Sequence, residues 1–197
     1  MVPLHQRRAR LQRGFTLIEL MIVVTIVGVV AALAAPTIGN ALANRRTNEL
    51  ALDVVSIVRE GRSAAVGQGR AYFLQIDPTS EQMMLFRGTT NRCTPHAGWS
   101  AITSAGCEGN VRCTAYVEGP VVGDSTYEFS VDGVDNPIDI CFEPTGITRW
   151  SAASAAFSDV HPNGGVQVNI RRMVHGSTSG VTKVVVIPFG ADARVMR

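Results

Sequence analysis

Residues 15–35 read FTLIELMIVVTIVGVVAALAA, and this stretch determines how the N-terminal part of the chain is built. It contains a single charged side chain, Glu19. A helix of about 20 residues is about 30 Å long, which matches the hydrocarbon core of a bilayer. The stretch is also longer than the apolar region of a secretory signal peptide. It therefore predicts a membrane-spanning helix.

The residues before this helix are basic. Residues 1–14 hold four arginines and no acid. The whole chain has 18 Lys and Arg against 16 Asp and Glu, so the rest keeps 18 − 4 = 14 basic residues and a net charge of −2. The positive-inside rule places such a segment in the cytoplasm, and Arg45 and Arg46 beyond the span weaken the contrast without reversing it. We therefore expect a single-pass membrane protein with its C-terminal part on the outer side of the membrane.

Glu19 is the exception in the apolar run. A carboxylate inside a membrane costs about 2.5–3.5 kcal/mol on insertion scales, so it needs water or a partner. One interpretation places Glu19 near enough to the interface to reach water. The other pairs it with a positive charge from another subunit, and cleavage after Gly14 would create such a charge on the α-amine of Phe15.

The segment Gly14-Phe15-Thr16-Leu17-Ile18-Glu19-Leu20 resembles the processing signature of type IV pilins and type II secretion pseudopilins. The resemblance implies that a prepilin peptidase cleaves after Gly14 and that the new N-terminal residue, Phe15, is methylated. It also implies that Glu19 docks the subunit onto other pilin or pseudopilin subunits in a filament. The resemblance further implies a structural subunit and not an enzyme, anchored in the bacterial inner membrane with its C-terminal head in the periplasm.

Beyond the span, Pro36 predicts a helix kink, because proline removes one backbone hydrogen bond. From Asn48 onward an amphipathic pattern indicates a second helical half to residue 66, with its charged face, which includes Arg62, in solvent. Gly67 and Gly69 are the predicted stop signals. The apolar positions of this half recur at helical spacing: Leu50, Val54, Ile57, Val58 and Ala65.

Residues 67–197 are expected to form an antiparallel β-rich head, which makes the fold class α+β. The predicted domains are a leader at 1–14, the membrane part of the helix at 15–35, its periplasmic half at 36–66 and the head at 67–197. Residues 88–110 form an expected long loop. The expected strands are 71–77, 81–87, 111–117, 126–131, 138–142, 155–159, 166–171 and 182–187, the first two joined by a hairpin at 78–80.

The four cysteines are disulfide candidates. None forms a C-x-x-C pair, so a zinc knuckle or thioredoxin-like motif is not indicated. In an oxidising compartment they are expected to form disulfides that hold the long loop. Three pairings remain open for Cys93, Cys107, Cys113 and Cys141.

Two head segments carry a finer resemblance. Phe142-Glu143-Pro144-Thr145-Gly146 resembles the F-x-P-x-G element of the H-type minor pseudopilins, the GspH/FimT family. Its members end in a strand, a glycine and a short final strand, as expected here for residues 181–195. Several carry a basic G-R-x-R element there that is linked to DNA binding. Gly190 and Arg194 match this element, whereas Ala191 and Asp192 depart from it.

The sequence gives little support for a metal site or a catalytic site. His96, His161 and His175 match no metal-ligand spacing, and the acids Asp132, Asp135 and Asp139 do not fit an EF-hand loop. No motif of a hydrolase, a phosphate-binding loop or a zinc protease is present. We expect no cofactor, no metal and no catalytic residue.

The sequence therefore predicts a minor pilin or pseudopilin that starts or caps a filament, in a type IV pilus or a type II secretion system. The alternative is a tip subunit that binds DNA or a secreted substrate. Expected partners are other pilin or pseudopilin subunits, the prepilin peptidase and the inner membrane; DNA is a weaker candidate.

Overall fold

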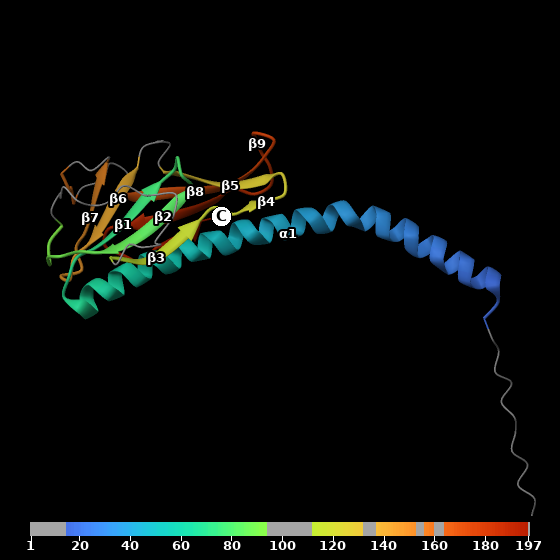
Figure 1. Ribbon diagram of the computed structural model, residues 1–197, viewed down its shortest axis with the longest axis horizontal. Coiled ribbons are helices and arrows are strands. Elements are labelled where there is room, and N and C mark those ends of the chain that lie inside the picture. The colour runs from blue at the N-terminus through green and yellow to red at the C-terminus, as the bar shows by residue number, and fades with distance from the viewer. Residues whose placement is uncertain (1–14, 94–111, 132–136, 153–155, 160–163, 197) are drawn as a thin grey trace, which may run out of the picture. The chain divides into compact units, whose positions relative to one another are not determined.

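The computed structural model describes residues 15–93, 112–131, 137–152, 156–159 and 164–196. A long helix comes first and a strand-rich head follows, as Figure 1 shows. The chain divides into two compact units, with the boundary between Ala41 and Leu42. The expected α+β class is confirmed.

The helix α1 spans Leu17–Gln68, whereas 15–66 was expected. It ends at Gln68 because Gly69 has a φ of 63°, the left-handed conformation that terminates helices. Gly67 still belongs to the helix, so the stop predicted there is wrong. The helix continues through Pro36, and the predicted kink stays a prediction.

Five strands form a first antiparallel sheet in the order β3-β2-β1-β6-β7. Their bounds are β1 Tyr72–Asp77, β2 Gln82–Arg87, β3 Cys113–Glu118, β6 Ile138–Phe142 and β7 Thr148–Ala152. The predicted hairpin is present, since Tyr72 pairs with Arg87 and Asp77 with Gln82. Strand β3 lies at one edge of this sheet among the described residues.

A second antiparallel sheet has the order β11-β10-β8-β5-β4, with β9 paired to β8. The bounds are β4 Val121–Val122, β5 Ser125–Val131, β8 Gly165–Val174, β9 Ser177–Thr178, β10 Lys183–Pro188 and β11 Arg194–Met196. The expected final strand after Gly190 is therefore β11.

One predicted strand is wrong. Of residues 155–159, the structure describes 156–159, which contain only an isolated bridge between Ser158 and Trp150. The strand in this region is instead β7. The reason is the turn before it, where the Gly146 amide donates to Glu143 O at 2.9 Å and Gly146 has a φ of 86°. This turn reverses the chain directly, so the next residues pair with β6.

The main core lies between the second half of α1 and the inner faces of both sheets. All five apolar positions predicted for this half of the helix are buried. They pack in one cluster with large side chains from each sheet, including Tyr72 and Phe142 from the first sheet and Tyr127 and Ile170 from the second. Because the helix supplies one wall of this cluster, the head unit begins at Leu42 and includes the helical half after it.

Candidate functional site

The start of α1 carries a helix cap that involves Glu19. The Glu19 amide donates to Thr16 Oγ1 at 3.2 Å, and the Leu20 amide donates to Thr16 O at 3.2 Å. Thr16 is thus the N-cap and Glu19 the third helical residue, which is the T-x-x-E spacing of a capping box. The sequence analysis missed this local role, although the spacing was visible. A carboxylate in the first turn also complements the helix dipole.

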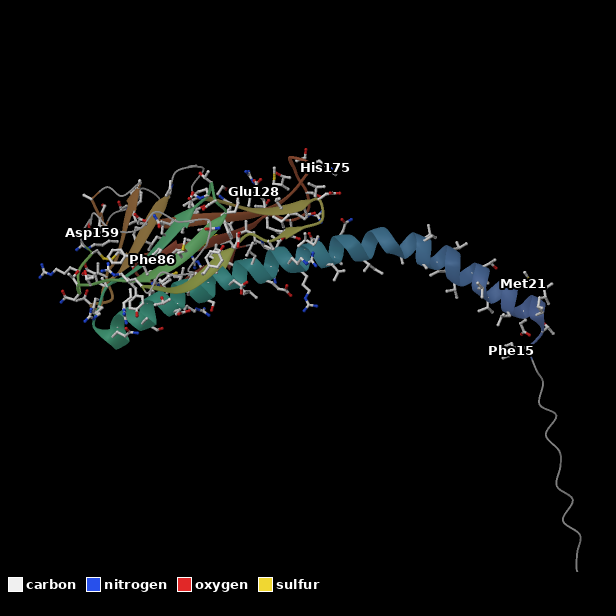
Figure 2. The ribbon with its side chains drawn as sticks, in the orientation of Figure 1. Phe15, Met21, Phe86, Glu128, Asp159 and His175 are labelled. Carbon is white, nitrogen blue, oxygen red and sulfur yellow. A yellow bond between two sulfur atoms is a disulfide. The ribbon has the colours of Figure 1, made fainter. Side chains whose placement is uncertain are left out.

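The helix after this cap exposes an apolar surface. Phe15 is 83% exposed, and Figure 2 shows Phe15 and Met21 at this end of the chain. Within the described residues, α1 is the helix long and apolar enough to cross a membrane, with a mean hydropathy of 2.7 in its most apolar window. Thr25 Oγ1 lies 2.9 Å from Met21 O and 2.8 Å from Ile22 O, so its hydroxyl is satisfied without water.

Glu19 has no cationic partner among the residues that the structure describes. The arginines nearest to it after the span are Arg45 and Arg46, and Arg45 pairs with Glu49 at 2.8 Å on the same helix. The cap satisfies the Glu19 amide and leaves its carboxylate available. Gly14, the other half of the predicted cleavage position, lies outside the described residues.

In the head unit, Arg62 connects the helix to the C-terminal segment. Its guanidinium donates to Pro188 O and Ala191 O, and it lies 4.0 Å from an Asp192 carboxylate oxygen. Its Cζ atom is 5.7 Å from the centre of the Phe142 ring. Arg62 was expected on a solvated face, and that expectation is wrong, since its side chain is only 20% exposed. Burial lowers the pKa of Arg62, and Asp192 partly offsets this effect.

A disulfide joins Cys93 to Cys141 across 48 positions of sequence. This is one of the linkages that the sequence left open. Cys113 is also disulfide-bonded, and the described part of the chain holds no free cysteine. Cys107 lies outside the described residues.

The F-x-P-x-G segment supports this disulfide. Glu143 Oε1 accepts a hydrogen bond from the Cys93 amide at 3.0 Å and lies 3.3 Å from Arg149 Nε. The Glu143 side chain is 11% exposed. Because Glu143 directly follows Cys141 and Phe142, one short turn fixes both the disulfide and a core phenylalanine.

A second acidic side chain links the two sheets. Glu81 is the last turn residue of the β1–β2 hairpin and has a φ of 56°, and its Oε2 accepts a hydrogen bond from the Phe129 amide of β5 at 2.6 Å. The pKa of Glu81 is raised to about 7, mainly by burial and to a smaller extent by Glu128 and Asp77, while the hydrogen bond from the Phe129 amide and the charge of Arg171 oppose the shift. Glu81 is thus a carboxyl group of the head that changes charge near neutral pH.

The remaining candidates do not come together as one site. His175 lies in an exposed turn, 4.0 Å from Asp124, and Figure 2 shows it at the tip after β8. Asp139 lies on β6, where burial raises its pKa to about 6. The described residues contain no group of three potential metal ligands. His96, His161, Asp132 and Asp135 lie outside the described residues.

The basic residues of the head are mostly engaged. Arg171 pairs with Glu128 at 3.1 Å, and Arg172 donates to Ser179 Oγ at 2.7 Å. Arg194, at the start of β11, is exposed.

Comparison with known proteins agrees with the N-terminal residues. A family model described as the prokaryotic N-terminal methylation motif matches residues 9–35. A fimbrial protein of Pseudomonas aeruginosa is 37% identical over 71 residues, 36% of this chain and 46% of that protein. The type IV major pilin protein PilE1 of Neisseria gonorrhoeae is 46% identical over 56 residues, 28% of this chain and 31% of that protein.

The chain spans less than half the length of these curated relatives. A crystal structure of the type IV minor pilin FimU of Pseudomonas aeruginosa aligns with a TM-score of 0.46 and 13% identity, covering 79% of this chain and 91% of that one. The N-terminal segment of this chain, with the methylation motif at the start of an apolar helix, is thus similar to the N-terminal segment of type IV pilins.

Proposed function

We propose that this protein is a minor pilin or pseudopilin of the H type, which is processed by a prepilin peptidase and helps to start or cap a filament. The observation that carries the proposal is the order of residues at the start of α1, where a basic leader and Gly14 precede an exposed Phe15 and a capped Glu19. It acts as a structural subunit of the filament.

Processing and docking are coupled in this proposal. Before cleavage, the Glu19 carboxylate has no cationic partner in the described chain and opposes its own burial in lipid. Cleavage after Gly14 creates the α-amine of Phe15, which a neighbouring subunit presents to Glu19. Pairing the two charges lowers the cost of burying each of them, so only processed subunits assemble.

The membrane topology follows from the charges. Residues 1–14 stay in the cytoplasm, residues 15–35 cross the inner membrane, and the helical half 36–66 and the head 67–197 lie in the periplasm. The Cys93–Cys141 disulfide fits this arrangement, since disulfides persist in oxidising compartments.

The test of processing is the mass of the N-terminal peptide from cells with and without the prepilin peptidase. We expect a chain that begins at N-methylated Phe15 when the peptidase is present, and the full leader when it is absent. A peptide that begins elsewhere, or a leader removed equally in both strains, would contradict the proposal.

The test of docking compares Glu19→Ala with Glu49→Ala, an exposed acid further along the same helix. Both variants should insert and be cleaved, and only Glu19→Ala should be lost from sheared filaments. Equal incorporation of the two variants would rule out the docking role.

An in-frame deletion strain distinguishes the two filament systems. Loss of surface pili with normal secretion assigns the protein to a type IV pilus, and the reverse assigns it to a type II secretion system.

A further inference from the structure

The head unit contains an open groove between α1 and the edge strand β3, which run side by side in Figure 1. Its volume is about 420 Å³. The helix contributes Asp53, Ser56, Ile57 and Glu60, and the strand contributes the four consecutive residues 115–118. Side chains of consecutive strand residues point to opposite faces of a sheet. Because all four line the groove, it follows the edge of β3 and not one of its faces.

The hydrogen-bond pattern of β3 directs main-chain groups into this groove. The Gly119 amide donates to Glu81 O at 2.9 Å, which continues the β2–β3 ladder. In an antiparallel ladder, alternate residues bond the partner strand. Val117 therefore also bonds to β2, and the main-chain N–H and C=O groups of Tyr116 and Glu118 point away from it. Among the described residues, no strand pairs with this side of β3.

The walls of the groove are acidic. Asp53 and Glu60 are exposed on the helix, and Glu118 is exposed on the strand. No lysine or arginine lines the groove, and none of the three acids takes part in an ion pair within the described residues. The Tyr116 hydroxyl donates to Glu118 Oε2, which holds the Glu118 carboxylate on the face of β3 opposite to Ala115 and Val117.

We propose that this groove binds an extended, basic peptide segment of a partner protein, which adds a strand to the edge of β3. An open strand edge is complementary to extended main chain, and this pairing is a common mode of peptide recognition. The carboxylates of Asp53 and Glu60 select lysine or arginine on the side of the segment that faces the helix, and Glu118 adds negative charge on the opposite side of the strand edge. The proposal concerns the unassembled chain and does not depend on filament formation.

Fluorescence anisotropy with the full chain in detergent micelles tests this proposal. The probe is a labelled octapeptide of alternating lysine and threonine, which has one basic face when extended. Its control is the same peptide with glutamate in place of lysine. We expect the lysine peptide to bind at least tenfold more tightly. Equal binding of the two peptides would overturn the proposal.

Two further comparisons separate strand addition from general attraction of charge. The double variant Asp53→Asn/Glu60→Gln should weaken binding about tenfold, whereas Glu49→Gln, an exposed acid outside the groove, should not. N-methylation of alternate residues blocks one edge of an extended peptide, so two lysine peptides, methylated at the odd or at the even residues, block opposite edges. One of these two peptides should lose binding. If both methylated peptides bind like the parent peptide, or if Glu49→Gln weakens binding as much as the double variant, the proposal is wrong.

Discussion

Removing the Cys93–Cys141 disulfide is expected to lower the stability of the head strongly. The cross-link closes a loop of 48 positions. The chain-entropy relation for such a loop gives about 4 kcal/mol of stabilisation at 25 °C. The double variant Cys93→Ala/Cys141→Ala removes it without leaving an unpaired thiol. Alanine at the fully buried Cys141 also avoids placing a hydroxyl in the core.

Thermal unfolding of the full chain in detergent measures this effect. A loss of about 4 kcal/mol corresponds to a decrease of about 8–16 °C in Tm for a chain of this size. Fluorescence of Trp150 reports on the part of the head that contains the disulfide, since Trp150 lies on β7 beside β6, the strand that carries Cys141.

Reductant provides the internal control. It should lower the Tm of the wild-type protein by at least as much as the double substitution does. A decrease of less than about 3 °C in the double variant, or about 1 kcal/mol, would refute the reasoning. The turn at Glu143 would then hold Cys93 in place without the covalent bond.

Three other perturbations have expected outcomes. Arg62→Met should cost about 2–4 kcal/mol in chemical unfolding through its lost charged hydrogen bonds, whereas the exposed Arg59→Met should change stability by less than about 0.5 kcal/mol. The raised pKa of Glu81, about 7, means that the folded state holds its proton more tightly than the unfolded state, so stability falls as pH rises from about 4.5 through 7. Glu81→Gln should therefore gain stability relative to wild type between pH 5 and pH 8, and a constant difference would contradict this assignment. Gly61→Ala should lower the stability of the protein in chemical unfolding, since its Cβ would lie 2.8 Å from a buried phenylalanine ring. Gly67→Ala should raise it by up to about 1 kcal/mol, because a Cβ there meets nothing within 4 Å. A stability change of the same sign in both variants would count against the packing described.

Local patterns in the sequence were enough to predict the helix and most of the strands. The apolar run after Phe15 and the helical spacing of Leu50 to Ala65 predicted α1 to within two residues at each end. The strands β1, β2 and β6 agree within one residue, because alternation and turn residues lie close together in the chain. The start of α1, with Phe15 and Glu19, was also readable, since the whole motif lies within a few residues.

Contacts between distant residues of the head could not be predicted from such local patterns. Arg62 was placed on a solvated face by its helical position, yet it binds carbonyl groups more than 120 residues away. Three other features also depend on residues that are far apart in the sequence. These are the pairing of Cys93 with Cys141, the contact of Glu81 with Phe129 and the acidic groove beside β3. Sequence by itself determined the apolar helix and the pilin-like motif at its start, because each depends on neighbouring residues along the chain. Only the tertiary structure decided which distant segments meet, because packing both sheets against one helix brings them together whatever their separation in sequence.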